Sequence, residues 1–230
     1  QTLSNCPCKM NKLLLSVFIA LVAQATTLTA VAQEVKGDAQ KGEGKVSLCI
    51  GCHGIIGYQA SFPEIHKVPM ISGQGAKYIV SALNAYKKGE RKHPTMRGIA
   101  DSLSDQDIAD VAAYYEASGV VAGAAALGKA ANGSAKAMAL AAKGGCASCH
   151  GDSFNTPIDP TYPKIAGQHS DYLLVALKAY KTEGNPHVGR GNAIMGSMVK
   201  QFSNAELKEL AQYIGSLPGE LKTVPQKKFK

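Results

Sequence analysis

The pattern Cys-x-x-Cys-His occurs twice in this 230-residue chain, as CIGCH at residues 49–53 and as CASCH at residues 146–150. Two cysteines followed directly by a histidine at this spacing indicate a c-type haem attachment site. The thiols can form thioether bonds to the two vinyl groups of one haem, and the histidine is then held beside the iron as its proximal ligand. Two such motifs therefore predict a fold built around two large flat cofactors.

The two halves of the chain are similar well beyond these motifs. Residues 69–89 (PMISGQGAKYIVSALNAYKKG) match residues 163–184 (PKIAGQHSDYLLVALKAYKTEG), and residues 96–115 match residues 195–214 in the same order and register. The short insertions that the alignment needs fall between the matched blocks, where surface loops tolerate them. The chain is therefore the product of a tandem duplication.

The duplication predicts two domains. We expect the first at residues 33–122 and the second at residues 134–230, because the Gly/Ala-rich stretch at residues 123–133 has the composition of a linker. A domain of roughly 90 residues buries only a marginal apolar core. Aromatic residues make up 6% of the chain and Trp is absent. A buried porphyrin would supply the large apolar body that such a core lacks.

Helical spacing dominates the matched blocks. Apolar and aromatic side chains recur at this spacing in residues 78–86 and 172–180, and no segment shows sustained strand-type alternation. The segments that lead into the cysteine motifs, residues 38–49 and 134–143, are also expected to be helical. Cap residues mark the ends of the predicted helices. The predicted N-caps are Asp38, Ser104, Ser134 and Ser203, and the predicted C-terminal glycines are Gly119 and Gly215.

Two other uses of the motif cysteines have to be weighed against haem attachment. The pairs could form disulfides in an oxidising compartment, or all four could bind one zinc ion. Either use leaves His53 and His150 without a role, and a shared zinc site needs both domains. Two covalently bound haem c groups account for the histidines as well as for Cys49, Cys52, Cys146 and Cys149.

The sixth ligand of each iron separates an electron carrier from a catalyst. Methionine favours Fe(II) and raises the reduction potential, whereas an open position permits substrate chemistry. Met96 and Met195 occupy equivalent places, in what we expect to be the loop opposite each haem-attachment helix. We predict that both ligate iron, although methionine more commonly fills cores. The other candidates lack a counterpart or stand in a different register: Met70, Met138, Met198, His93 and His187.

Polar residues near these ligands have two interpretations each. Arg91 and Arg190 precede the two methionines by a few residues and could pair with haem propionates or remain in solvated loops. Two further equivalent pairs could hydrogen-bond to propionates or to each other across a domain interface, or could simply cap and pack helices. These pairs are Gln74 with Gln168 and Tyr78 with Tyr172.

The segment from Met10 to Ala32 has the layout of a secretory signal peptide. A lysine is followed by an apolar run at residues 13–23 and by an Ala-Val-Ala site that ends at Ala32. This run is short of the roughly 20 residues of a membrane-spanning helix. We therefore predict that residues 1–32 direct export to the periplasm and are cleaved, with an uncleaved anchor as the alternative. Cys6 and Cys8 precede Met10 and are interpreted as upstream sequence lost with the signal, in preference to a metal-binding pair.

Basic residues are unevenly distributed. Residues 33–124 contain 10 basic and 10 acidic side chains, whereas residues 125–230 contain 13 basic and 7 acidic ones. The second domain is therefore expected to dock an acidic redox protein, or to associate peripherally with an anionic membrane surface. Nucleic acid is excluded as a partner, because the chain carries an export signal and no basic cluster interleaved with aromatics. The lysines chosen for the docking hypothesis are Lys178, Lys181 and Lys200.

Together these features resemble the cytochrome c4 family of dihaem cytochromes c. The similarity covers residues 33–230 and rests on CIGCHG and CASCHG, on the repeated Gly-Gln…Tyr…Leu…Tyr helices and on the matched closing blocks. The resemblance implies an all-α fold of two tandem class I cytochrome c domains, related by duplication with approximate two-fold symmetry. It also implies a periplasmic electron carrier, not an enzyme, which takes electrons from a respiratory donor complex and passes them to a terminal oxidase or other reductase.

The residue roles that the resemblance implies follow the motifs. Covalent attachment falls to the four motif cysteines, proximal ligation to His53 and His150, and distal ligation to Met96 and Met195. The second repeat departs further from the pattern, because Phe202 replaces Leu103 and the loop from Tyr180 to Met195 is five residues longer than that from Tyr86 to Met96.

The implied mechanism is outer-sphere electron transfer through two haems in series. Two other functions share parts of the pattern. One is a cytochrome subunit of a larger oxidoreductase, such as the dihaem partner of a flavoprotein sulfide dehydrogenase. The other is a dihaem peroxidase, which needs an accessible iron, and Met96 and Met195 argue against that.

Overall fold

The computed structural model describes residues 35–119 and 134–225, all of which belong to one compact unit. The predicted signal segment (residues 1–32), with Cys6 and Cys8, and the predicted linker (residues 123–133) lie outside the described residues. In the described part of the chain, no helix is long and apolar enough to cross a membrane.

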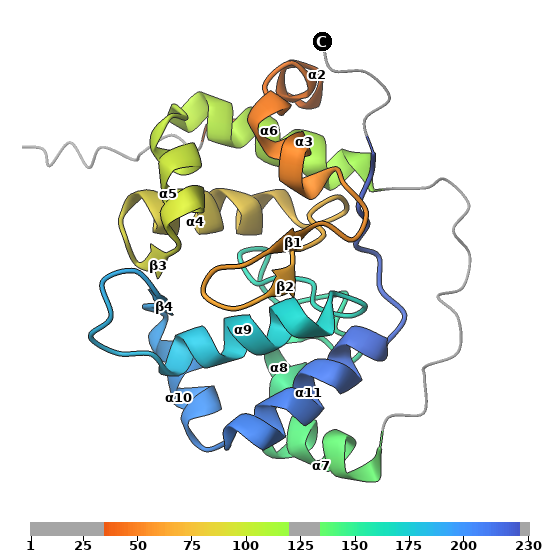
Figure 1. The fold of residues 1–230 in the computed structure, drawn as a ribbon. Helices are drawn as coiled ribbons and strands as arrows, with labels where there is room; N and C mark the ends of the chain where they lie inside the picture. The colour runs from red at the N-terminus through yellow and green to blue at the C-terminus, as the bar shows by residue number, and fades with distance from the viewer. Residues whose placement is uncertain (1–34, 120–133, 226–230) are drawn as a thin grey trace, which may run out of the picture. The chain divides into compact units, whose positions relative to one another are not determined.

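Each repeat is built from the same succession of helices (Figure 1). The helices of the first repeat are α2 (Ala39–Glu43), α3 (Ser47–His53), α4 (Ala76–Lys87), α5 (Pro94–Asp101) and α6 (Asp105–Ser118). Those of the second are α7 (Ala135–Lys143), α8 (Cys146–His150), α9 (Ser170–Lys181), α10 (Ala193–Lys200) and α11 (Asn204–Ser216). The cysteine motifs fall on α3 and α8, so equivalent elements carry them. The predicted all-α class is confirmed.

Strands of two residues each supplement the helices. Within the first repeat, β1 (Gln59–Ala60) pairs antiparallel with β2 (His66–Lys67). Between the repeats, β3 (Arg91–Lys92) pairs antiparallel with β4 (Gly189–Arg190), with Arg91 opposite Arg190. The second pairing joins the two repeats, and nothing in the helical pattern of the sequence indicated it.

The predicted N-caps are confirmed, because each side chain accepts backbone hydrogen bonds in the first turn of its helix. Asp38 caps α2 and Ser134 caps α7. Ser104 and Ser203 form complete capping boxes at the starts of α6 and α11. These local signals therefore fix where the outer helices of each repeat begin.

The single helix predicted over residues 38–49 is instead two helices, with a turn at residues 44–46 between α2 and α3. The turn lets Gly42 lie directly against the backbone of α6, where a side chain would collide with the carbonyl of Asp110. It also lets Val46 enter the core, where it is 3% exposed. A straight helix could not meet both requirements.

The two predicted C-terminal glycines behave differently. Gly119 caps α6 as predicted, whereas Gly215 does not end α11, which continues to Ser216 and stops before Pro218. Gly215 serves close packing, since a Cβ at this position would lie 2.7 Å from the backbone oxygen of Gln168. The prediction that α11 ends near Gly215 is confirmed to within one residue, but a long-range contact, not helix termination, requires the glycine.

The apolar faces of the helices form a core in each repeat. In the first repeat α6 packs against α2 and α4, and in the second α11 packs against α7 and α9. Residues of the first core include Ile79, Leu83, Ile108 and Val111, and those of the second include Phe154, Phe202, Leu207 and Leu210. Partly buried at the edges of these cores are Cys49, Met96, Cys146 and Met195. The cores therefore support the predicted haem-binding residues.

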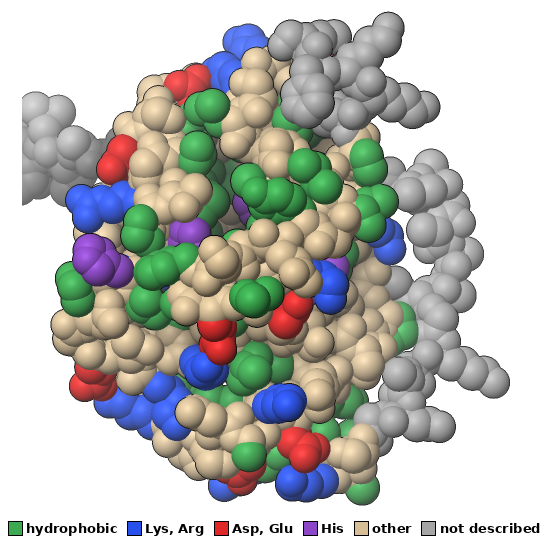
Figure 2. Space-filling model, viewed as in Figure 1, with side chains coloured by type: hydrophobic (Ala, Val, Ile, Leu, Met, Phe, Trp, Pro, Cys, Tyr) green, Lys and Arg blue, Asp and Glu red, His purple; other side chains and the backbone are tan. Residues whose placement is uncertain are grey.

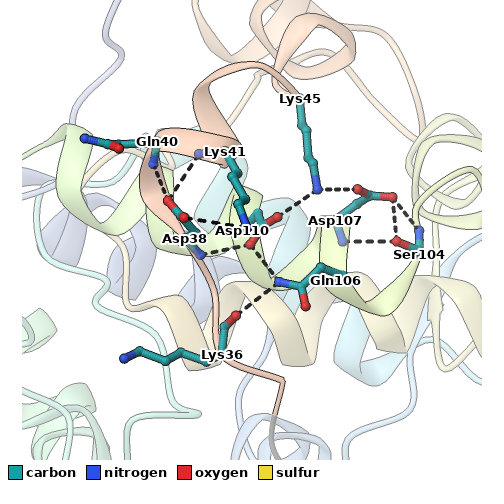
Figure 3. A network of polar contacts seen from close by, with 9 residues as sticks. All are labelled: Lys36, Asp38, Gln40, Lys41, Lys45, Ser104, Gln106, Asp107 and Asp110. Carbon is teal, nitrogen blue, oxygen red and sulfur yellow. Dashed lines mark hydrogen bonds and ion pairs between the residues drawn. The ribbon is translucent and has the colours of Figure 1, made fainter.

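A buried carboxylate ties the start of the first repeat to α6 (Figure 3). The side chain of Asp110 is fully buried. It accepts hydrogen bonds from the backbone N–H of Asp38 at 2.8 Å, from the Gln106 amide at 2.8 Å and from the Lys45 ammonium at 2.7 Å. Lys45 also contacts the partly buried carboxylate of Asp107 at 2.6 Å. These contacts compensate for the burial of the Asp110 charge.

Replacing Asp110 with Asn is expected to lower the free energy of unfolding by roughly 1–3 kcal/mol, because a charged hydrogen bond is lost and a donor stays unpaired. Denaturant titration of the haem-loaded protein, followed by far-UV circular dichroism, measures the change. Glu209→Gln is the matched control. Glu209 occupies the equivalent position in the second repeat, but its side chain is 36% exposed where it pairs with Lys136. Glu209→Gln should therefore leave the free energy of unfolding almost unchanged. An equal loss of unfolding free energy in the two variants would contradict the claim that burial makes the Asp110 contacts stabilising.

The same network should make stability depend on pH in the acid range. The hydrogen bond from Lys45 lowers the pKa of Asp107 to about 2 and also lowers the pKa of Asp110. Their stabilisation is therefore complete above the ordinary Asp pKa of about 4 and is lost as the pH falls toward about 2. Between these pH values, Lys45→Met should lose stability less steeply than the unaltered protein. The free energy of unfolding of both proteins is measured by denaturant titration at several acid pH values. An equal dependence on pH in the two proteins would refute this prediction.

Candidate haem sites

A large cavity lies between the two repeats. Its volume is about 950 Å³, at the upper end of the range for ligand pockets, and residues of both repeats line it. On the face shown in Figure 2, hydrophobic side chains gather around a recess at whose edges histidine side chains are visible. All eight residues predicted to bind haem line the cavity: Cys49, Cys52, His53, Met96, Cys146, Cys149, His150 and Met195.

The motif cysteines have the form that thioether attachment needs. All four are free of disulfides. Burial raises the pKa of Cys49 to about 11 and also raises the pKa of Cys146, so these side chains are neutral thiols near pH 7. Among the described residues, no group of three or more His, Cys, Asp or Glu side chains could hold a metal ion. The geometry thus supports neither disulfide pairs nor a shared zinc site.

Each motif histidine is held by a proline carbonyl. Nδ1 of His53 lies 2.9 Å from the oxygen of Pro69, and Nδ1 of His150 lies 2.9 Å from the oxygen of Pro163. A carbonyl can only accept, so Nδ1 carries the proton in both histidines and Nε2 keeps its lone pair for a metal. Burial lowers the pKa of both histidines, which keeps them neutral. A neutral imidazole with its second nitrogen bonded to a carbonyl is the usual arrangement of a metal ligand.

The predicted methionine ligands lie in the first turn of a helix in each repeat, and not in the loop that we expected. Met96 follows the N-cap of α5 and Met195 the N-cap of α10. Their backbone N–H groups donate to the caps, His93 at 3.4 Å and Asn192 at 2.9 Å. A short helix at this point fixes the direction of both side chains better than an irregular loop would.

Two arginines meet at the junction of the repeats. Arg91 and Arg190 donate to the same acceptor, the hydroxyl of Tyr172, at 2.8 and 3.1 Å. Arg91 also donates to Tyr78 at 3.2 Å and lies over the ring of Tyr86. Burial by itself would raise the pKa of Tyr172, but the two guanidinium charges outweigh it and lower the pKa to about 8.

This arginine pair fits the acidic groups of a haem. Neither Arg91 nor Arg190 forms an ion pair with a carboxylate of the described residues, and Nε of Arg91 is buried without a hydrogen-bond partner there. Buried guanidinium groups need anionic partners. Both arginines line the cavity, and each haem carries two propionates. The described residues therefore fit the cofactor that the cysteine motifs indicate.

Sequence reasoning missed how the loop at residues 59–67 of the first repeat binds α9 of the second. Glu64 contacts Lys178 at 2.6 Å, and Asp171 accepts a hydrogen bond from the backbone of Lys67 at 3.1 Å. His66 is buried beside the ring of Tyr172. The available signal was an insertion: 14 residues lie between Gly54 and Pro69, against 11 between Gly151 and Pro163 in the second repeat. Its contacts could not be read from the insertion alone.

Comparison with known proteins agrees with this geometry. The Cytochrome c family model matches residues 39–117 and again residues 134–218. Cytochrome c4 of Pseudomonas aeruginosa is 32% identical over 211 residues, which cover 90% of this chain and 100% of that protein. The crystal structure of reduced recombinant cytochrome c4 from Pseudomonas stutzeri aligns with a TM-score of 0.57 at 30% identity, covering 79% of this chain and 99% of that one.

A relative with a different name is also similar. The thiosulfate dehydrogenase electron acceptor of Stutzerimonas stutzeri is 28% identical over 178 residues, which cover 74% of this chain and 78% of that protein. The family, however, is settled by the longer and closer matches. The chain belongs to the cytochrome c family as a cytochrome c4-type electron carrier, with two tandem cytochrome c domains and two covalently bound haem c groups.

Proposed function

We propose that this protein is an exported dihaem carrier that moves electrons between a respiratory donor and a terminal oxidase or reductase. The observation that carries the proposal is that one cavity contains two copies of one donor set, each with two thiols, a carbonyl-bound histidine and a methionine. Cys49 and Cys52 would attach one haem, and Cys146 and Cys149 the other. The axial ligands would be His53 with Met96, and His150 with Met195.

Each residue of the set has a separate task. When bound, each haem supplies an iron that cycles between Fe(III) and Fe(II). The proline carbonyls keep His53 and His150 in the tautomer that offers Nε2. The methionine thioethers are soft, neutral donors that would favour the reduced state and fill the position at which a substrate would otherwise bind. With histidine and methionine both bound, no position on the iron would be open to substrate, which suits transfer without bond making.

Partner contact is proposed at the exposed apolar residues around the cavity. Leu48 and Phe62 of the first domain and Ile194 and Met198 of the second all line the cavity and are 38–55% exposed. Exposed apolar groups at a binding site are typical of transient protein contacts. Two such areas, one on each domain, would let electrons enter through one domain and leave through the other.

The docking role predicted for three lysines of the second domain is weakened by their contacts within the protein. Lys178 pairs with Glu64, Lys200 pairs with Glu183, and Lys181 donates to the backbone oxygen of Phe202. Each of these lysines has a partner within the protein, so removing it would disturb that contact as well as any docking. The acidic partner remains a prediction, and the salt dependence of reduction by a candidate donor tests it without substitutions.

Export to the periplasm is part of the proposal and rests on the sequence pattern of residues 10–32. The domain limits predicted above, residues 33–122 and 134–230, also stay part of it. A second candidate role is that of the electron-accepting subunit of a sulfur-compound dehydrogenase, which the thiosulfate dehydrogenase acceptor relative favours. Stable co-purification with a dehydrogenase or a flavoprotein would support that role over a free carrier.

The ligand assignment predicts a simple spectral result. Protein matured with haem should carry two haems per chain and show the weak methionine-to-iron charge-transfer band of oxidised His/Met cytochromes. Met96→Ala and Met195→Ala should each remove about half of this band, and the double variant all of it. Absorption spectra of the oxidised proteins, normalised to haem content, measure the change.

Met198→Ala is the matched control for this experiment. Met198 lies on the same helix as Met195 and also lines the cavity, but its exposure is 41% and it has no counterpart in the first domain. The control should keep the whole band. Loss of half the band in Met198→Ala, with Met195→Ala unchanged, would move the second distal ligand to Met198.

A further inference from the structure

Each domain reaches across the interface with one glutamine. Oε1 of Gln168 accepts a hydrogen bond from the backbone N–H of Met70 at 3.0 Å, and its Nε2 donates to the oxygen of Met70 at 2.9 Å. Gln74 makes the mirror-image pair with Lys164 in the second domain, at 3.0 and 2.9 Å. Met70 and Lys164 are equivalent positions in the repeat, so the contact is reciprocal.

The orientation of both side-chain amides is determined by their surroundings. Oε1 of Gln168 also accepts from the backbone N–H of His169 at 3.1 Å, and Oε1 of Gln74 from that of Gly75 at 3.0 Å. Two N–H groups converge on one atom in each case, so that atom must be the oxygen. Both glutamines are 4% exposed, and solvent therefore competes little for these bonds.

The peptide group that each glutamine binds also holds a motif histidine. The N–H of Met70 and the C=O of Pro69 belong to one peptide unit, which accepts from Nδ1 of His53 at 2.9 Å and donates to Gln168 at 3.0 Å. Likewise, the peptide unit between Pro163 and Lys164 links His150 to Gln74 with the same two distances. A continuous chain of hydrogen bonds thus runs from each histidine to the glutamine of the other domain.

Such chains are cooperative. When a peptide N–H donates a hydrogen bond, the unit is polarised and its carbonyl becomes a stronger acceptor. A stronger bond to Nδ1–H makes the imidazole a more basic metal ligand. More basic ligands stabilise Fe(III), which lowers the reduction potential of the iron.

We propose that Gln168 and Gln74 are positioning residues that act across the interface, each one orienting and polarising the peptide that tunes the proximal histidine of the other domain. The inference rests on the proposed function, in which His53 and His150 ligate iron. Its consequence is that the potential of each haem depends on contact with the neighbouring domain. Any event that loosens the interface then raises both potentials.

The test compares Gln168→Leu with Gln74→Leu in the full-length, haem-loaded protein. Leucine keeps the size of the side chain and removes both hydrogen bonds. Potentiometric titration gives the two midpoint potentials, and the Nδ1–H resonances of the histidines in the reduced, ¹⁵N-labelled protein report on each bond to proline. In Gln168→Leu the reduction potential of the first-domain haem should rise and the Nδ1–H resonance of His53 should move upfield. The potential of the second-domain haem and the His150 resonance should stay unchanged. Gln74→Leu should show the reverse.

The haems are assigned through Met96→Ala and Met195→Ala, each of which should abolish the methionine signals of one domain. If neither variant abolishes the methionine signals, the proposed iron ligation is wrong. That result is distinct from a failure of the proposed role of the two glutamines. With the assignment secure, a shift confined to the glutamine's own domain, equal shifts in both domains or no shift at all would overturn the inference.

Gln168→Glu covers the case in which the leucine variant does not fold. A carboxylate still accepts from the N–H of Met70, and more strongly, but cannot donate to its oxygen. The first-domain haem should then fall in potential relative to the second, and the His53 proton should move downfield. A rise in that potential, or a change at His150 instead of His53, would contradict the mechanism.

Discussion

The structure depends on filling the cavity between the two repeats. Each repeat has a small core of its own, with Cys49 and Met96 packed against the first and Cys146 and Met195 against the second. These residues and the motif histidines line a space of about 950 Å³. Apolar walls of this extent gain their stability only when a large apolar body covers them. A bound haem would therefore complete the core of each domain as well as serve as its cofactor.

The parts of the structure that could be predicted from the sequence are those with local signals. Helix starts follow from capping residues three positions from their partners, and Cys-x-x-Cys-His places thiols and imidazole on a single short helix. The methionines could be chosen because the duplication supplied an internal comparison. Their helical setting was missed, since an N-cap such as His93 is an unusual residue for that position.

What could not be predicted lies at the interface, where partners are far apart in the sequence. Arg91 meets Tyr172 across 81 positions and Gln168 meets Met70 across 98. No spacing rule connects such residues. The repeat indicated that Gln168 and Tyr172 could take part in an interface, but not that their partners would be Met70 and Arg91. The reason for the glycine at position 215 was missed on the same ground, because a backbone approach from Gln168 requires it.

The two domains share the hydrogen bonds of the motif histidines but differ in other surroundings of the proposed haem sites. The histidine–peptide–glutamine chains have the same distances in both domains, so the proposed influence on ligand basicity would be the same in both. The domains differ at the Asp110 network, where Asp110 is fully buried but its equivalent Glu209 is 36% exposed, and at the loop of residues 59–67, which lies in an insertion of the first domain. Two haems with equal ligands can still differ in potential through such unequal surroundings. That difference would give electrons a preferred direction between the domains.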